Sequence, residues 1–408
     1  MNNNDTTPTI SHNNRQVPNG YKKTAIGIIP SDWKIMTLGE LSDIKTGKKD
    51  NQNKVDDGLY PFFVRSKNIE RINSYSYDGE AILIPGEGNI GEIFHYINGK
   101  FDYHQRVYKI SDFTDETTGK FIFYYFQVFF LKETIRHSVK ATVDSLRLPT
   151  FTEMVIHLPP LSEQQKIAEI LSTWDDAINT CKKTIDTIKD RNKGLAQQLL
   201  SGKIRLNRFS VKWNKTELGK ISKRVTTKNE ELNDTVVTIS AQRGFILQED
   251  FFNKRVASDT LSGYFLLKKG QFAYNKSYSN GYPMGAFKRL NNFEKAVVTT
   301  LYICFELLEN VNSDFMVHYF ENGFMTNKLM KVAKEGGRAH GLLNIGLDDF
   351  MNLELTIPSF EEQTAIAQVL ETADQELKSY EAKLEALQLQ KKGLMQQLLT
   401  GKIRVNVN

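Results

Sequence analysis

A glycine-rich segment is the first place where this sequence could hold a cofactor. Gly86, Gly88 and Gly91 have the spacing of dinucleotide-binding loops and follow an apolar, strand-like run. Such a loop needs a helix directly after it, because the helix N-terminus binds the pyrophosphate. The residues that follow, EIFHYINGKF, are instead typical of a strand and a tight turn. We interpret the segment as a loop and not as a cofactor site.

Other catalytic patterns are incomplete. Ser201-Gly202-Lys203 matches the end of a phosphate-binding loop but lacks its earlier glycine and its final Ser or Thr. Pro159-Pro160 lacks the flanking residues of the amino-methyltransferase motif. The seven histidines pair with no cysteine at metal-ligand spacing, and no serine or cysteine has a nucleophile-elbow context. We therefore expect no catalytic residue, no metal site and no cofactor bound by this chain.

Composition narrows the class of protein. A chain of 408 residues with 40% hydrophobic and 25% charged residues can form two or three domains with ordinary cores. The net charge of +5 permits nucleic-acid binding but does not argue for it. Two cysteines make no disulfide framework, the longest apolar run is too short for a bilayer, and the N-terminus does not have a signal-peptide pattern. We expect a cytoplasmic protein with no membrane partner.

The chain repeats itself. The segment Pro159–Leu206 aligns without a gap with Pro358–Val405, and the match is best at the ends, KGLAQQLLSGKIR and KGLMQQLLTGKIR. A shorter match precedes each block, because Trp33 and Leu38-Gly39 recur as Trp213 and Leu218-Gly219. The order is therefore variable block, helical block, variable block, helical block.

Each helical block predicts one long helix. Both blocks begin with proline and an acidic first turn, and both end in a glycine suited to a left-handed cap, Gly202 or Gly401. Apolar residues recur at alternating spacings of four and three, which indicates a coiled-coil seam. The seam consists of Ile167, Leu171, Trp174, Ile178, Cys181, Ile185, Ile188, Leu195 and Leu199, then Ile366, Leu370, Ala373, Leu377, Tyr380, Leu384, Leu387, Leu394 and Leu398.

A polar residue interrupts each seam, Asn192 in the first and Lys391 in the second. Either these residues fix the register of the pair, or they face solvent where the helices splay. A helix over Ser162–Leu200 would be roughly 58 Å long and needs a long partner. We favour antiparallel pairing of the two copies within one chain; a helix lying on its own domain and a homodimer seam are the alternatives.

The variable blocks have short apolar runs cut by Gly, Asn and Pro, which predict mainly β domains. Asn98-Gly99 predicts a hairpin turn, and helices are expected near Lys120–Val139 and Ser313–Glu335. The fold class is α+β: two globular domains joined by two long antiparallel coiled-coil helices, as a pseudo-two-fold internal repeat. The predicted divisions are a disordered tail (1–20), domain 1 (21–158), helical spacer 1 (159–203), domain 2 (204–357) and helical spacer 2 (358–408).

This layout resembles the specificity subunit of type I restriction-modification enzymes. The resemblance covers nearly the whole chain from about Tyr21, and its most specific parts are TAIGIIPSDWKIMTLGEL, LPPLSEQQKIAEIL, IPSFEEQTAIAQVL and the two QQLL-S/T-GKIR endings. It implies that each variable block is a target recognition domain that reads one half of a split, asymmetric site on double-stranded DNA. The paired helices would set the spacing and dock two modification (methyltransferase) subunits.

The same resemblance assigns the chemistry to other chains. S-adenosylmethionine, ATP and Mg would be held by the partner subunits, and restriction (motor-nuclease) subunits would complete the assembly. The specificity subunit itself would be non-catalytic, which agrees with the incomplete catalytic patterns. Two alternatives stay open: a stand-alone two-domain DNA-binding protein, and a non-DNA scaffold organised by its coiled coil.

Candidate DNA-reading residues are donors near glycine-rich or aromatic loops, because base edges are read mainly by Arg, Lys, Asn and Gln. For domain 1 they are Arg65, Lys67, Asn89, His104, Gln105, Arg106, Lys140 and Arg147. For domain 2 they are Gln242, Arg243, Lys276, Tyr278, Asn280, Arg338 and His340.

Overall fold

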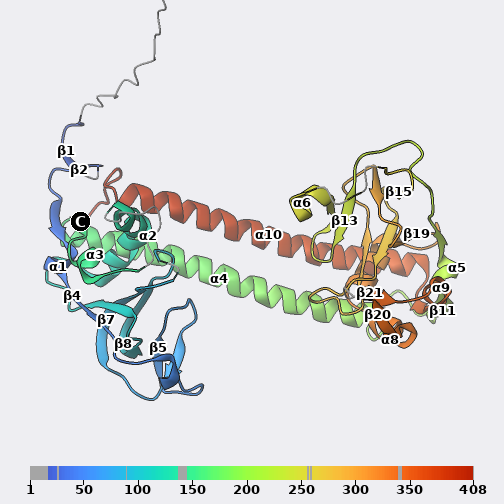
Figure 1. The fold of residues 1–408 in the computed structure, drawn as a ribbon, viewed down its shortest axis with the longest axis horizontal. Helices are drawn as coiled ribbons and strands as arrows, with labels where there is room; N and C mark the ends of the chain where they lie inside the picture. The colour runs from blue at the N-terminus through green and yellow to red at the C-terminus, as the bar shows by residue number, and fades with distance from the viewer. Residues whose placement is uncertain are drawn as a thin grey trace, which may run out of the picture. The chain divides into compact units, whose positions relative to one another are not determined.

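The computed structural model describes residues 17–24, 27–88, 90–136, 145–254, 257, 260–338 and 342–407. The chain divides into two compact units. Unit 1 contains residues 1–182 and 383–408, and unit 2 contains residues 183–382. The two long helices, α4 (Leu161–Leu200) and α10 (Phe360–Leu398), each begin in one unit and end in the other (Figure 1). Each unit therefore contains the start of one repeated helix and the end of the other.

Unit 1 is built on a six-stranded sheet in the order β4-β9-β7-β8-β5-β6. Its strands are β4 (Asp43–Thr46), β5 (Tyr60–Phe63), β6 (Glu70–Ile72), β7 (Tyr77–Pro85), β8 (His95–Tyr103) and β9 (Val107–Ser111). Smaller elements are β1 (Tyr21–Thr24), β2 (Gly27–Pro30), β3 (Lys34–Thr37), α1 (Leu38–Leu41), the 3-10 turn η1 (Asn51–Asn53), α3 (Leu148–Thr152) and β10 (Val155–Leu158). Strand β1 pairs with β2, and β3 pairs with β10.

The apolar run in the first variable block forms helix α2 (Gly119–Arg136). Its aromatic side chains are buried on several sides, and they share one core with Ile82 of the sheet and with Ile167 and Leu171 of α4. A helix that is apolar nearly all round is suited to such a position between a sheet and another helix.

The predicted hairpin at Asn98-Gly99 is wrong. Both residues lie inside β8, where Asn98 pairs with Glu80 and Gly99 pairs with Gly79 of β7. The two facing glycines have φ values of +142° and +151°, which side chains rarely adopt. The glycines thus accommodate an irregular backbone within a continuous strand, and the chain reverses before and after β8 instead.

Unit 2 has a four-stranded sheet in the order β12-β19-β16-β17 and four separate strand pairs. Its strands are β11 (Asn214–Glu217), β12 (Ser222–Arg224), β13 (Val237–Ser240), β14 (Gly244–Leu247), β15 (Phe265–Lys268), β16 (Phe272–Asn275), β17 (Ala286–Arg289), β18 (Lys295–Val298), β19 (Ile303–Leu307), β20 (Lys334–Arg338), β21 (Leu342–Asn344) and β22 (Glu354–Ile357). Its short helices are α5 (Leu218–Ile221), α6 (Gln248–Phe252), α7 (Ser313–Glu321), α8 (Thr326–Val332) and α9 (Leu347–Met351).

The expected helix near Ser313–Glu335 is two helices, α7 and α8. Gly323 separates them with a φ of +75°, and α8 ends before β20 begins. On the side facing the core, α7 buries Phe315, Met316 and Tyr319 against Ile366 and other residues of α10. It thus occupies the place that α2 has in unit 1, between the sheet and a long helix.

Both units share a frame of repeated elements. Elements β3 and α1 recur as β11 and α5, while α3 and β10 recur as α9 and β22. In unit 1 the Leu38 amide donates to the Met154 carbonyl over 2.9 Å, and in unit 2 the Leu218 amide donates to Leu353 over 3.0 Å. The same backbone contact therefore joins the start and the end of the variable block in each unit, while the sheets themselves differ in strand order.

The helix ends follow their sequence signals. Gly202 and Gly401 both have left-handed backbones, with φ values of 71° and 67°. In both places the glycine amide bonds the carbonyl three residues earlier, at Leu199 or Leu398. Because glycine has no Cβ, it ends each helix in this conformation without steric cost.

Candidate nucleic-acid interface

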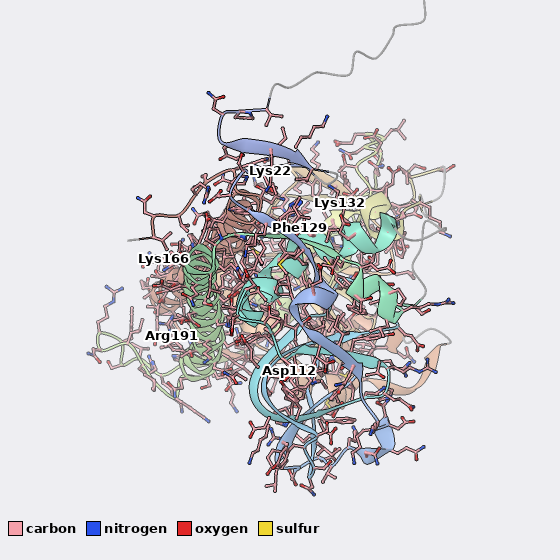
Figure 2. The ribbon with its side chains drawn as sticks, turned by 90° about the vertical axis from the view of Figure 1, so that its left-hand side faces the viewer. Lys22, Asp112, Phe129, Lys132, Lys166 and Arg191 are labelled. Atoms are coloured by element: carbon pink, nitrogen blue, oxygen red, sulfur yellow. The ribbon has the colours of Figure 1, made fainter. Side chains whose placement is uncertain are left out.

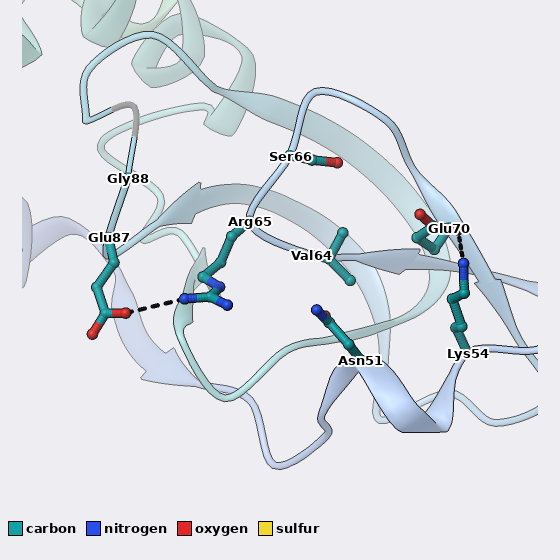
Figure 3. A pocket seen from close by; sticks show the side chains of 8 residues that line it. All are labelled: Asn51, Lys54, Val64, Arg65, Ser66, Glu70, Glu87 and Gly88. Carbon is teal, nitrogen blue, oxygen red and sulfur yellow. Dashed lines mark hydrogen bonds and ion pairs between the residues drawn. The ribbon is translucent and has the colours of Figure 1, made fainter.

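Two arginines of unit 1 meet at one carboxylate. Arg65 follows β5, and Arg106 lies in the turn between β8 and β9. Nη1 of Arg65 lies 3.3 Å from Oε2 of Glu87, and Nη1 of Arg106 lies 2.9 Å from Oε1 (Figure 3 shows the first pair). The two arginine side chains are 44% and 60% exposed. A ligand from solvent can therefore reach both guanidinium groups.

An open hollow of about 420 Å³ lies beside this cluster (Figure 3). On its opposite wall, Nζ of Lys54 lies 3.5 Å from Oε2 of Glu70. Its lining residues are Asn51, Lys54, Val64, Arg65, Ser66, Glu70, Glu87 and Gly88. The hollow is thus lined by both hydrogen-bond donors and acceptors. Base edges present both kinds of group, whereas phosphates present only acceptors.

The turn that contains Arg106 is fixed by a buried histidine. His104 is 3% exposed, and its Nδ1 accepts a hydrogen bond from the Arg106 amide over 2.9 Å. Burial lowers the pKa of His104, while the Asp50 carboxylate, 3.5 Å from its Nε2, opposes that shift. Gln105 is exposed and donates to Asp50 over 3.3 Å. His104 therefore supports the turn, while Gln105 and Arg106 are its exposed candidates.

The other candidates of domain 1 are less closely grouped. Lys67 is exposed in the loop after β5, two residues from Arg65. Arg147 is exposed at the start of α3. Asn89 and Lys140 lie outside the described residues.

Sequence reasoning missed the acidic members of this cluster, Glu87, Asp50 and Glu70, because it searched only for donors. One signal was present in the sequence. Glu87 stands between Gly86 and Gly88, where a loop can approach another backbone closely.

Three segments of unit 2 converge around its candidate residues. Nε2 of Gln242, in the turn between β13 and β14, donates to the Asn280 carbonyl over 3.0 Å. The Leu343 amide in β21 donates to the Lys276 carbonyl over 3.0 Å. Tyr278, in the same loop as Lys276 and Asn280, is 66% exposed. The loop between β16 and β17 is therefore linked both to the β13–β14 turn and to the β20–β21 hairpin.

Arg243 is exposed beside Gln242, and its amide donates to the Ser240 hydroxyl over 3.2 Å. Arg338 is the last residue of β20. His340 lies outside the described residues.

The helical seam shows a regular pattern of burial. Every seam residue predicted from the sequence is buried or half-buried, and Ile167, Leu171 and Ile366 are at most 1% exposed. By contrast, Lys166 on α4, labelled in Figure 2, is 43% exposed and forms an ion pair with the exposed Glu169. Within each unit the start of one helix packs against the end of the other, so the helices run antiparallel there.

Both polar seam residues bond to the opposite helix. In unit 2, Nδ2 of Asn192 donates to the Ala373 carbonyl over 2.8 Å. In unit 1, Nζ of Lys391 lies 2.6 Å from Oδ1 of Asp175, whose other oxygen accepts from the Tyr124 hydroxyl over 2.7 Å. These contacts favour the interpretation that the polar residues fix the register over the one that they face solvent.

Residues that recur in both repeats form an ion-pair network around a buried carboxylate in unit 1. Glu163 is 1% exposed and accepts hydrogen bonds from Nε and Nη2 of Arg404, each over 2.8 Å. The Trp33 indole donates to the same carboxylate over 3.2 Å. Arg404 also bonds Asp32, which lowers the pKa of that carboxyl. The last basic residue of the second repeat is thus joined to the first turn of the first repeat.

Unit 2 contains the reciprocal network. Arg205, at the end of the first repeat, bonds both oxygens of Glu362 over 2.6 and 2.7 Å. Glu362 is 2% exposed, and the Trp213 indole donates to it over 3.3 Å. In place of a second carboxylate, Arg205 donates to the Val211 carbonyl. The repeated Trp, Glu and Arg residues therefore join the two repeats in both units.

In the part of the chain that the structure describes, no group of three or more His, Cys, Asp and Glu residues is placed to hold a metal ion. Within the same residues, no helix has the length and apolar character needed to cross a membrane.

The structure defines a class of internally duplicated protein, in which two β-rich domains with different loops are attached by one repeated frame to long helices. Comparison with known families gives the particular class. The pattern of the type I restriction modification DNA specificity domain matches residues 30–190 and again 211–389. The chain belongs to this family and is a specificity subunit of a type I restriction-modification system.

Relatives with curated descriptions agree. The specificity subunit of the type I restriction enzyme EcoDI of Escherichia coli is 33% identical over 175 residues, which cover 43% of this chain and 38% of that protein. The MjaVIII specificity subunit of Methanocaldococcus jannaschii is 25% identical over 93% of this chain and 95% of its own length. The solved S subunit from M. genitalium has the same fold, with a TM-score of 0.56, 17% identity and coverage of 90% of this chain and 96% of that one.

Proposed function

We propose that this chain recognises a bipartite, asymmetric site on double-stranded DNA, each unit reading one half. The main support for the proposal is that the two units share one frame of repeated residues but differ in their loops. Both units have the same Trp–Glu–Arg network, yet unit 1 presents an Arg–Glu–Arg cluster and unit 2 presents a Gln, Asn and Tyr loop group. Different side chains on equivalent frames predict two different half-sites rather than a palindrome.

The loop chemistry supports reading of bases. Exposed Arg, Gln and Asn side chains are the usual partners of guanine and adenine in the major groove. Tyr278 gives unit 2 an exposed apolar surface suited to contact with a thymine methyl group. The turn that contains Gln105 and Arg106 and the loop that contains Lys276 are held by backbone hydrogen bonds, so little backbone entropy would be lost there on binding.

The helices would set the distance between the two half-sites and dock two methyltransferase subunits. Helix α4 has 40 residues and α10 has 39, about 60 Å of helix at the usual rise. That length exceeds the ~34 Å that separates half-sites one DNA turn apart. The polar seam residues Asn192 and Lys391 would keep the register, and hence the spacing, constant.

In this proposal the chain performs no catalysis. S-adenosylmethionine, ATP and Mg would be bound by the modification and restriction subunits, in a cytoplasmic complex. This division of labour rests on the family to which the chain belongs and on the incomplete catalytic motifs in its sequence.

A selection from random duplex DNA tests the proposal. The intact chain is assayed alone and with its methyltransferase partner, at two salt concentrations, because phosphate contacts weaken with salt. The expected result is one motif with two specified parts and a fixed gap. A contiguous motif would contradict two spaced readers, and no enrichment in either sample would favour a protein-binding scaffold.

A further inference from the structure

We propose that Glu87 is a positioning residue that orients Arg65 and Arg106 toward a guanine in the half-site read by unit 1. This inference rests on the proposed function. It adds a residue that touches no base itself but decides how two arginines present their donors.

Three backbone hydrogen bonds hold the segments that carry Arg65, Glu87 and Arg106. The His104 amide donates to the Phe63 carbonyl over 2.9 Å, and the Gln105 amide donates to Lys49 over 2.8 Å. The Gly86 amide, next to Glu87, donates to the Arg106 carbonyl over 2.8 Å. The backbones that carry the acid and the Arg106 turn are thus bonded to each other. The backbones that carry Glu87 and Arg106 are therefore fixed before any ligand arrives, which places the Glu87 carboxylate within reach of both arginines.

Several N–H donors of Arg65 and Arg106 are not used by Glu87 and are available to DNA. A guanidinium has five N–H donors, and Glu87 engages only Nη1 of Arg65 and Nη1 of Arg106. Among the described residues, no other side-chain hydrogen bond of either guanidinium occurs. The Nε–Nη2 edge of each arginine is therefore available. That edge offers two parallel donors, which match the O6 and N7 acceptors of guanine.

Charge distinguishes this site from a phosphate-binding patch. A carboxylate between two arginines cancels one of their two positive charges, and Lys54 is likewise paired with Glu70 at the hollow. A surface selected to hold phosphates gains nothing from such acids, because they repel the DNA backbone. Acids beside exposed arginines instead weaken binding to arbitrary DNA while fixing the geometry needed for one base.

The decisive variant is Glu87→Gln, assayed as the intact chain with its methyltransferase partner. Glutamine keeps one oxygen acceptor, loses the charge and cannot hold both arginines. We expect discrimination at one G·C position of one half-site to fall about tenfold, with the other half-site unchanged. We also expect affinity for random-sequence duplex at low salt to rise about twofold to fivefold, because a repulsive charge is removed.

Two further variants complete the test. Glu116→Gln is the matched control, since Glu116 forms a comparable ion pair with Lys34 at 2.6 Å and follows β9, away from the strand end that carries Glu87. Arg106→Lys keeps the charge but removes the two-donor edge, and we expect it to affect the same G·C position as Glu87→Gln.

The outcomes separate this inference from the proposed function. If the wild-type complex selects a bipartite motif and Glu87→Gln changes neither half nor the affinity for random DNA, the positioning role is wrong. It is also wrong if Glu87→Gln and Arg106→Lys change different half-sites. A wild-type complex that selects no bipartite motif would instead overturn the proposed function itself.

Discussion

Units 1 and 2 have the same frame and different surfaces. In each, a buried carboxylate on the first turn of a long helix is held by a tryptophan and by the last arginine of the other repeat. Around that frame, unit 1 builds a six-stranded sheet and an aromatic helix, whereas unit 2 builds a four-stranded sheet with separate strand pairs. A few repeated residues thus make the same contacts in both units, while the sheets and loops between them differ.

Breaking the Arg–Glu ion pairs of the frame is expected to have the largest effect on stability. Replacing Arg404 or Arg205 by alanine leaves a carboxylate, Glu163 or Glu362, buried without its cation. Such a loss costs about 3 to 5 kcal/mol of unfolding free energy. We expect Arg404→Ala to be the more damaging change, because Arg404 also holds Asp32.

Urea unfolding followed by tryptophan fluorescence measures both variants. The pair Lys166–Glu169, with both side chains exposed, is the control, and Lys166→Ala is expected to cost under about 1 kcal/mol. If the two arginine variants were as mild as this control, the frame would not depend on the repeated ion pairs.

A buried histidine makes the stability of the unit 1 frame depend on pH, and the unit 2 frame lacks this residue. His157 in β10 is 3% exposed, and burial lowers its pKa to about 4, despite the opposing charge of Glu133. In the unfolded chain a histidine has a pKa of about 6.5. The stability gained from burying neutral His157 is therefore fully present above that pH. As the pH falls toward 4 this contribution is lost, and the unfolding free energy falls by about 3 kcal/mol. Unit 2 has Thr356 at the equivalent position in β22.

The histidine prediction is checked by comparing wild type with His157→Thr, which introduces the residue that the other repeat uses. Unfolding free energies are measured at pH 7 and pH 4.5. The variant should lose less stability than wild type between these values. Equal losses in the two proteins would show that another group controls the acid sensitivity.

Replacing Arg224 is expected to have a smaller effect on stability, and to stabilise the protein rather than destabilise it. In β12 its Nε and Nη1 are buried, with no hydrogen-bond partner in the described part of the chain, and unit 1 has Ile44 at the matching place. Burial lowers the pKa of Arg224 and raises that of nearby Cys304 to about 12. We expect Arg224→Ile to stabilise unit 2 by about 1 to 2 kcal/mol in thermal or urea unfolding. Destabilisation would mean that the stacking of Arg224 on Phe265 outweighs its desolvation.

The frame was predictable from the sequence because repetition reveals it. The seam, the two glycine caps and the antiparallel pairing follow from spacing and from residues that occur twice. The sequence did not show that Glu163 and Arg404 would meet, since they lie at opposite ends of the helical repeats and come together only when the helices pair.

The variable blocks were less predictable, since each occurs once. Asn98-Gly99 has the composition of a hairpin turn, but pairing with β7 along its length keeps β8 continuous. The two-residue signal was local, whereas the outcome depended on a strand from elsewhere in the sheet. Glu87 was missed for the same reason, because its two arginine partners lie in other loops.

The central claim is that each unit reads its own half of one DNA site. The most direct test repeats the DNA selection with two variants of the intact complex, Arg106→Ala in unit 1 and Gln242→Ala in unit 2. Each variant is expected to relax specificity in a different half of the motif and to leave the other half and the gap unchanged. If both variants altered the same half, or neither altered the motif, the assignment of one reader to each unit would be contradicted.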